Sequence, residues 1–363
     1  MSDDLNVVVT GPGEVVLRAA EASPPRDGTF RVETLFTGVS AGTELSYVKG
    51  TNPYLSAGWD ATLGLFVEGE PDTPYPVDRL GYMEVGRVTE SRTPAVAEGT
   101  VVAMTYGHRT AYRGDPLVDR VVPLPPDLDP MLGIYVAHMG PICANGLLHA
   151  AADLYGSAAR DLADGVRGRR VAVTGAGVVA LLTALFARRA GAASVVVLDP
   201  TPQRRAVAEA LGLETLDPTD GDPAVVLKTR WRHAAGDRGA DVVFQCRGQA
   251  SALHLALRLL RPQGTVIDLA FYQGGADAVR FGTEFHHNGL SLRCAQIGRV
   301  PRGLAPTWDR DRLSAETIAL LREYGDALRK HLVSAVVPLD EAPAVLTDLA
   351  ARRRHELQVV FAA

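Results

Sequence analysis

Cysteine is scarce in this chain of 363 residues, which contains only Cys143, Cys246 and Cys294. An odd and widely spaced set cannot form a disulfide framework, and no Cys-x-x-Cys pair is present to hold a structural metal. Because disulfides persist only in oxidising compartments, this scarcity indicates a reducing one. We therefore predict a cytoplasmic protein.

Long apolar runs and a basic surface are also missing. No window approaches the ~18 uninterrupted apolar residues of a membrane-spanning helix, and the chain begins with acidic residues rather than with a basic and then apolar leader. The formal net charge is -5 and the pI is about 6.0. Such a surface offers no field that attracts nucleic acid or anionic lipid. We predict no nucleic-acid and no membrane partner, which leaves a small molecule.

The sequence is long enough for two domains. Its 47% hydrophobic and 22% charged residues are typical of a globular protein. Residues 1–141 hold short β-type runs divided by glycine and proline, which predicts a mostly β domain. Between residues 170 and 270, strands alternate with helices of about ten residues or more, a pattern that requires a parallel sheet covered on both faces. After residue 299 come a helix, a strand, a second helix and a last strand, and we expect this short tail to complete the first domain.

A glycine-rich turn directly follows the strand predicted at 170–174. It reads Gly175-Ala176-Gly177-Val178-Val179-Ala180, a G-x-G-x-x-A motif that opens a predicted helix. The first glycine permits the tight turn and the second lets the backbone approach a pyrophosphate, while the helix N-terminus attracts the phosphate charge. The predicted cofactor contacts in this turn are therefore Gly175, Gly177, Val178 and Val179.

Coenzyme selectivity is predicted from the next strand. Asp199 ends the strand predicted at 194–198, where a carboxylate accepts hydrogen bonds from the ribose hydroxyls and repels a 2′-phosphate. NAD is therefore predicted over NADP. Arg204, on the following helix, is a further cofactor candidate that would partly offset this selectivity, with a solvated helix charge as the alternative.

The order of a β domain, a dinucleotide domain and a returning tail resembles the medium-chain dehydrogenase/reductase superfamily, that of the zinc alcohol, polyol and threonine dehydrogenases. The resemblance runs over nearly the whole chain. Besides the glycine-rich turn, it is carried by residues 38–44, 80–86, 239–248 and 264–266. Residues 284–288 and 308–313 resemble a branch that contains bacteriochlorophyllide dehydrogenase.

The resemblance implies an α/β fold with two domains. A mostly β, GroES-like catalytic domain would comprise residues 1–141 and 300–363, and a Rossmann domain with a doubly wound parallel sheet would comprise residues 142–299. The superfamily also implies an oxidoreductase and a homodimer that pairs the edge strands near Leu290–Ala295. Cys246 falls on the loop that touches the adenosine side of the cofactor.

The superfamily's zinc-binding positions carry other residues in this chain. Ala41 replaces the cysteine of the first loop, Tyr82 replaces the histidine of the Gly-His-Glu motif, and the third ligand position falls near Gly140. The four-cysteine lobe that holds a structural zinc has no counterpart. We therefore predict no metal. The alternative is a site rebuilt from His108, Glu44 and Glu84.

Without zinc, polar side chains of the β domain would have to hold the substrate oxygen. His108 is the predicted proton donor because a histidine has an ordinary pKa near neutrality and this one follows a strand end, with a packed histidine as the alternative. By resemblance, Thr43 occupies the place of a proton-relaying hydroxyl, and Tyr82 would donate to a substrate oxygen; capping a turn and filling volume are their respective alternatives. The predicted substrate contacts are Glu44, which in the superfamily usually supports the site from behind, Tyr106 and Tyr272.

These features predict a zinc-independent, NAD-linked oxidoreductase that interconverts a secondary alcohol and a ketone on a polar, sugar-like or cyclitol-like molecule, in a biosynthetic pathway. One alternative is reduction of an activated C=C bond in an enone or quinone, which needs no strong acid. Another is a dinucleotide-binding protein without turnover. The polar residues retained around the former zinc position favour carbonyl chemistry.

Overall fold

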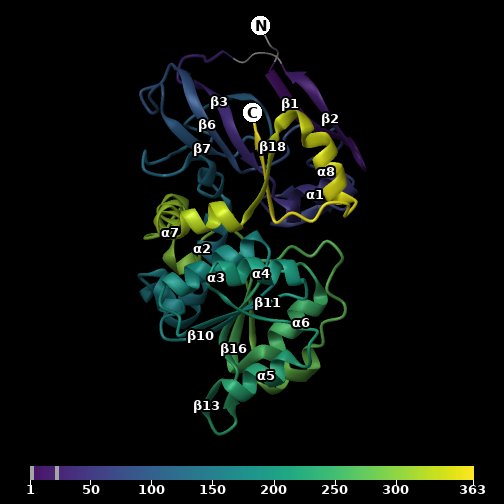
Figure 1. Cartoon of the computed structure of the whole chain (residues 1–363), viewed down its shortest axis with the longest axis vertical. Helices are drawn as coiled ribbons and strands as arrows, with labels where there is room; N and C mark the ends of the chain where they lie inside the picture. The colour runs from purple at the N-terminus through teal and green to yellow at the C-terminus, as the bar shows by residue number, and fades with distance from the viewer. Residues whose placement is uncertain (1–3, 21–23) are drawn as a thin grey trace. The chain divides into compact units, whose positions relative to one another are not determined.

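The computed structural model describes residues 4–20 and 24–363, which fall into two compact units. Unit 1 spans residues up to 138 together with residues 333–363, and unit 2 spans residues 139–332. The yellow C-terminal elements lie with the purple and blue N-terminal strands of unit 1 (Figure 1).

Unit 1 is the mostly β domain that the sequence predicts. Its strands are β1 (Asp4–Gly11), β2 (Glu14–Ala20), β3 (Phe30–Gly38), β4 (Ala57–Asp60), β5 (Leu65–Glu68), β6 (Glu84–Ser91), β7 (Val101–Met104), β8 (Ala111–Gly114), β9 (Val122–Pro123), β18 (Val333–Pro338) and β19 (Gln358–Ala362). Its α-helices are α1 (Ala41–Lys49) and α8 (Ala342–Ala350), and the short η1 (Pro53–Leu55), η2 (Pro130–Tyr135) and η7 (Leu339–Glu341) are 3₁₀ turns.

The C-terminal strands complete the main sheet of unit 1. That sheet has the order β18-β19-β3-β6-β7-β9, with β8 also paired to β3. β19 runs antiparallel to β3, so that Val360 lies opposite Gly38. Alternate residues of β3 such as Phe30 and Val32 are fully buried, as expected for strands with one face on a core.

Unit 2 contains the dinucleotide-type sheet. Its strands are β10 (Arg170–Thr174), β11 (Ser194–Leu198), β12 (Glu214–Leu216), β13 (Arg232–Ala234), β14 (Asp237–Arg238), β15 (Ala240–Gln245), β16 (Leu260–Asp268) and β17 (Ser291–Cys294). Its helices are α2 (Met139–Tyr155), α3 (Val178–Arg189), α4 (Pro202–Ala210), α5 (Pro223–Arg230), α6 (Ala250–Leu259) and α7 (Arg310–His331), with short turns η3 (Gly156–Ala158), η4 (Leu162–Gly165), η5 (Phe281–Phe285) and η6 (Arg302–Leu304).

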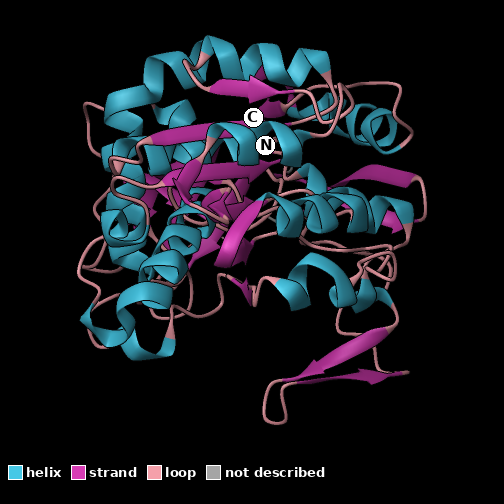
Figure 2. Ribbon diagram, turned by 90° about the horizontal axis from the view of Figure 1, so that it is seen from below, coloured by secondary structure: helices cyan, strands magenta, loops and turns pink. Residues whose placement is uncertain are grey.

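The six-stranded sheet of unit 2 has the order β12-β11-β10-β15-β16-β17, and every neighbouring pair is parallel. The chain reverses its direction across the sheet between β10 and β15. Such a switch point leaves a crevice at the carboxyl ends of the strands, where doubly wound folds bind ligands. Strands, in magenta, lie between helices, in cyan, in Figure 2.

The domain boundary differs from the one expected at residues 299 and 300. Unit 2 continues to Leu332 because α7 packs against α2 and α3 rather than joining the β domain. Gly140 on α2 makes this packing close, since a Cβ there would lie 2.1 Å from Cγ2 of Thr317 on α7. Only residues 333–363 of the tail therefore belong to unit 1. In the described part of the chain, no helix is long and apolar enough to span a bilayer.

Candidate active site

The glycine-rich turn of unit 2 sits at the carboxyl end of β10, as predicted. Gly175 has a φ of +101°, in the left-handed region that favours glycine. A Cβ on Gly177 would meet no atom within 4 Å, so the space in front of this residue is open. Helix α3 starts at Val178 and no side chain caps it. Its first N–H groups therefore lack intrahelical partners and are available to an anion.

Asp199 ties this turn to the end of β11. Its Oδ2 accepts the N–H of Ala176 at 2.9 Å, and its Oδ1 accepts the N–H of Thr201 at 2.8 Å. The residue is only 1% exposed. Each carboxylate oxygen can accept more than one hydrogen bond, so the lone pairs left over are those that a ribose would use.

The other predicted cofactor residues lie at the same edge of the sheet or beside it. Arg204 is half-buried on α4, whereas its neighbour Arg205 is held by Asp217 at 2.8 Å. Cys246 follows β15 directly and donates its N–H to the carbonyl of Thr174 at 3.0 Å. Burial raises the pKa of its thiol well above the ordinary value, so the thiol stays protonated.

A polar network crosses the carboxyl ends of three adjacent strands, and of its members the sequence had indicated only Tyr272. The fully buried Gln245, at the end of β15, hydrogen-bonds Thr174 of β10 through its Oε1 and donates from Nε2 to the hydroxyl of Tyr272 at 3.0 Å. Tyr272 in turn donates to Asp268 of β16 at 2.9 Å. Burial raises the pKa values of both Tyr272 and Asp268. Only the position of Gln245 at a predicted strand end could have signalled its role.

These features fit a dinucleotide. The left-handed glycine, the open space at the second glycine and the uncapped helix start together form a pyrophosphate cradle. Gly175, Gly177, Val178 and Val179 would hold the phosphates.

In unit 1, His108 is completely buried and both of its ring nitrogens are bonded within the protein. Nε2 lies 2.7 Å from Oε2 of Glu44, and Nδ1 lies 2.6 Å from the hydroxyl of Thr37. Burial alone would lower the pKa of His108, but the Glu44 carboxylate, with a further contribution from Glu84, raises it above its ordinary value. This hydrogen-bonded contact with Glu44 therefore favours the protonated form of the His108 ring.

Glu84 lies beside this pair. The hydroxyl of Thr37 donates to its Oε1 at 3.3 Å. Burial raises the pKa of Glu84 to about 7, although His108 partly opposes the effect. Gly81 makes the approach possible, because a Cβ there would lie 3.0 Å from Glu84 Oε1 and 3.1 Å from the His108 ring. Its φ of +105° also favours glycine.

Three hydroxyl groups lie next to Glu44, and two of them, those of Tyr82 and Thr43, belong to partly exposed residues. The oxygen of Tyr82 hydrogen-bonds Oγ of Ser40 and lies 3.5 Å from Oγ1 of Thr43. Tyr82 and Thr43 are both half-buried. Ser40 precedes α1, the helix that replaces the loop expected around Thr43, and its N–H donates to Oε1 of Glu44 at 2.7 Å. Ser40, Thr43 and Tyr82 are called the hydroxyl cluster below.

His138 completes this surface, and the sequence reading did not select it. Its ring centroid lies 4.5 Å from that of Tyr82, with the two planes tilted by 59°. The residue is half-buried and comes directly before α2. Its place just before the lost ligand position near Gly140 is the signal that could have identified it.

Tyr106 lies elsewhere in unit 1. It is 1% exposed, its oxygen is 2.8 Å from Oγ1 of Thr34, and its ring stacks on Tyr112 at 4.9 Å. In this structure the side chain has almost no surface to offer a substrate.

The residues at the superfamily's zinc position do not fit that metal. Ala41 has no donor atom, Tyr82 offers a phenol, and Gly140 has no side chain. His108, in the rebuilt alternative, has both nitrogens occupied. Over residues 4–20 and 24–363, no group of three or more His, Cys, Asp or Glu side chains is arranged to hold a metal ion.

Comparison with known proteins matches this chain to proteins that are described as dehydrogenases. Residues 178–306 match the family described as zinc-binding dehydrogenase. The chain is 27% identical over 344 residues to D-guloside 3-dehydrogenase of Escherichia coli, which covers 93% of each protein. Among solved structures, L-idonate 5-dehydrogenase of Escherichia coli matches with a TM-score of 0.71 at 18% identity, over 100% of this chain and 99% of that one. A Sinorhizobium meliloti protein described as a zinc-binding dehydrogenase, bound to NADP, matches with a TM-score of 0.74 at 21% identity over 100% of both chains.

The fold and the pyrophosphate cradle fit a dinucleotide-binding enzyme, and the matched proteins are described as dehydrogenases. Residues 178–306 thus resemble the zinc-binding dehydrogenase family, and the chain is similar over most of its length to a D-guloside 3-dehydrogenase. The structural matches, at identities below 25%, support the fold alone.

Proposed function

We propose that this enzyme is an NAD(H)-dependent dehydrogenase that interconverts a secondary alcohol and a ketone on a sugar-like molecule without using zinc. The observation that carries the proposal is the hydroxyl cluster at the superfamily's metal position. Three hydroxyl groups there lie next to one another, with Tyr82 bonded to Ser40 and close to Thr43. They supply hydrogen bonds where a zinc ion would otherwise polarise the substrate oxygen.

In this mechanism the hydroxyl cluster holds the reacting oxygen. When bound, the nicotinamide would supply a hydride to the carbonyl carbon that bears this oxygen, or accept one from the carbinol carbon in the reverse direction. Tyr82 donates a hydrogen bond to the oxygen, which becomes negative as a ketone is reduced, and Thr43 orients it. In ketone reduction the half-buried Tyr82 hydroxyl passes its proton to the oxygen and is reprotonated from solvent, while Ser40 holds it in place through their hydrogen bond; alcohol oxidation runs these steps in reverse.

His108 supports this cluster from behind. A direct role as proton donor, the role predicted from its ordinary pKa, would require an accessible ring nitrogen, and both nitrogens are bonded. We therefore propose that His108 is a positioning residue. It holds Glu44, whose second oxygen accepts the N–H of Ser40, and Ser40 in turn holds Tyr82. Glu44, predicted as a substrate contact, acts in the same chain of contacts.

The substrate class is supported by the relative matched over most of its length. That protein is a D-guloside 3-dehydrogenase, and 93% of each chain is covered by the match. A secondary hydroxyl on a pyranoside ring, with polar neighbours on both sides, suits a site made of hydroxyl groups and an imidazole such as His138.

We further propose that NAD is preferred over NADP and that the enzyme forms a homodimer. Asp199 supports the first proposal, because a carboxylate at the end of β11 repels a 2′-phosphate. The edge position of β17 in the six-stranded sheet supports the second, because its outer side is free to pair with the same strand of another copy. Light scattering that gave the mass of a single chain at micromolar concentration would contradict a dimer.

One observation favours a second candidate, the reduction of an activated C=C bond. His108 has no accessible nitrogen in this structure, and hydride addition to the β-carbon of an enone needs no strong acid at the carbonyl. The polar residues in the hydroxyl cluster favour carbonyl chemistry instead. We therefore propose the interconversion of an alcohol and a ketone.

A substrate panel tests the choice between these functions. Methyl glycosides and polyols are incubated with NAD⁺, and enones and quinones with NADH, while absorbance at the nicotinamide band is followed. The proposal expects NADH to form with at least one glycoside and no enone to be reduced at a comparable rate. Reduction of enones alone would overturn it in favour of the second candidate.

A further inference from the structure

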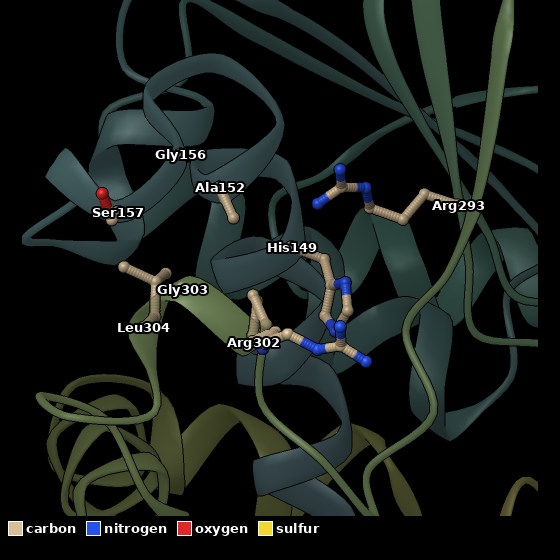
Figure 3. A pocket seen from close by; sticks show the side chains of 9 residues that line it. His149, Ala152, Gly156, Ser157, Arg293, Arg302, Gly303 and Leu304 are labelled. Atoms are coloured by element: carbon tan, nitrogen blue, oxygen red, sulfur yellow. The ribbon is translucent and has the colours of Figure 1, made fainter.

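A cavity of about 370 Å³ in unit 2 has three basic side chains in an otherwise mostly apolar lining. His149 on α2, Arg293 on β17 and Arg302 on η6 face the same space (Figure 3). The side chains of Arg302 and Arg293 approach the space around the His149 ring from different segments (Figure 3). The cavity shares no residue with the glycine-rich turn.

These basic groups have few partners in the described part of the chain. Arg302 has no ion pair there, and Arg293 has only a long one, with 3.7 Å between its Nη2 and Oδ1 of Asp153. That carboxylate is shared, because its other oxygen accepts the hydroxyl of Thr265 at 2.6 Å. Arg293 is therefore only weakly paired with a carboxylate that is half-engaged elsewhere, and together with Arg302 it leaves positive charge at the cavity.

His149 is the second observation that indicates a ligand. Both of its ring nitrogens are buried, and neither has a hydrogen-bond partner of standard geometry among the described residues. Burial, followed by the nearby charge of Arg293, lowers the pKa of His149 to about 4, and the backbone of Arg299 offsets a small part of this effect. A buried polar group without a partner costs free energy, commonly about 1–3 kcal/mol. A bound anion that accepts its N–H would remove that cost.

The remaining lining residues suit the carbon part of a ligand. Ser157 adds a hydroxyl, while Ala152, Pro301 and Leu304 are apolar. The volume falls within the ~300–1,000 Å³ typical of small-molecule sites. Arginine side chains bind phosphate oxygens through paired N–H groups, which distinguishes a phosphate ester from an uncharged ligand.

We propose that this cavity binds the phosphate group of a small phosphorylated metabolite, with Arg293, Arg302 and His149 as the groups that hold it. The proposal is independent of the reaction proposed above, because the cavity contains none of the residues assigned to it.

Calorimetry on the full chain tests the site. NADH is added first to saturation, so that phosphate groups cannot bind at the glycine-rich turn. Glycerol 3-phosphate, glucose 6-phosphate and inorganic phosphate are then titrated separately. At least one ester is expected to bind at one site per chain, several-fold more tightly than inorganic phosphate. Equal affinity for inorganic phosphate would overturn the assignment to a metabolite, and no binding of any of the three at millimolar concentration would overturn the site.

Variants locate the binding. Arg302→Gln and Arg293→Gln should each weaken the ester by about 10-fold or more, as expected when a charged hydrogen bond is lost. Ser157→Asp should abolish binding by placing a carboxylate in the cavity. The control Arg280→Gln removes an equal charge from an exposed position of the same unit and should change nothing. NADH affinity, measured on each variant, reports that unit 2 is folded. Unchanged ester affinity in both arginine variants would refute the proposal.

Discussion

The glycine-rich turn of unit 2 and the hydroxyl cluster of unit 1 are built in opposite ways. The turn presents backbone N–H groups, and its geometry follows from Gly175 and Gly177 within one short segment. The hydroxyl cluster uses side chains from segments about 40 residues apart, and its Tyr82 is held through Ser40, Glu44 and His108. A backbone site therefore depends on local sequence, whereas a side-chain site depends on the whole domain around it.

Removal of His108 should have the largest effect on stability. His108→Ala leaves the buried Glu44 carboxylate without its ion-pair partner, and breaking a buried pair in this way commonly costs about 3–5 kcal/mol. Urea denaturation should show this loss in the unfolding free energy. The double variant His108→Gln with Glu44→Gln removes both charges and should recover part of it. A loss below about 1 kcal/mol for His108→Ala would mean that the pair does not support unit 1.

Removal of the Tyr82 hydroxyl should slow the chemical step without weakening the binding of the cofactor. Tyr82→Phe should lower kcat by about 10²–10³-fold, the usual effect of losing one donor to a developing oxyanion, and leave NADH affinity unchanged. Tyr112→Phe is the matched control, because its hydroxyl bonds Asp119 outside the hydroxyl cluster. If Tyr82→Phe turned over at the wild-type rate, the substrate oxygen would have to be held elsewhere.

The dependence of the unfolding free energy on pH should show the ionisation of Glu84. Its pKa is about 7 in the folded chain against an ordinary 4.5, so the folded state binds the proton more tightly. Its contribution to stability is therefore complete below about pH 4.5 and is lost as the pH rises through 7, by about 3 kcal/mol. Glu84→Gln cannot ionise and should lack this loss. Parallel pH profiles for the wild type and the variant between pH 5 and 8 would contradict the burial argument.

Coenzyme selectivity should give the smallest effect. NADH should bind at least about 10-fold more tightly than NADPH, about 1.4 kcal/mol, because Asp199 repels the 2′-phosphate. Asp199→Asn removes the charge and keeps one of the two oxygens that accept the N–H groups of Ala176 and Thr201, so the ratio of NADH to NADPH affinity should narrow. Calorimetry with NADH and with NADPH measures the two affinities. Equal affinities in the wild type would indicate that Arg204 neutralises the phosphate.

Much of unit 2 could be predicted because its signals are local. The strands 170–174 and 194–198 were predicted with the bounds that the structure has, and the glycine-rich turn lies between β10 and α3 as expected. The assignment of α7 to unit 2 could not be predicted from a local pattern. Its attachment to α2 depends on the fit of Thr317 against Gly140, two residues far apart in the sequence.

For the candidate site in unit 1, the sequence could predict some of the residues that take part but not how they are arranged. Tyr82 and Thr43 were selected by their positions, and the structure brings their oxygens within 3.5 Å. His108 was selected by its ordinary pKa, but burial and the Glu44 carboxylate decide what it does. His138 carries no local motif, and only the fold brings its ring next to Tyr82.

The most direct test of the proposed chemistry is a crystal structure of the enzyme with NADH and a bound glycoside, with anomalous scattering recorded at the zinc edge. The account predicts the reacting oxygen within hydrogen-bond distance of the Tyr82 hydroxyl and no anomalous peak beside it. A zinc ion bound to that oxygen, or an oxygen out of reach of Ser40, Thr43 and Tyr82, would contradict it.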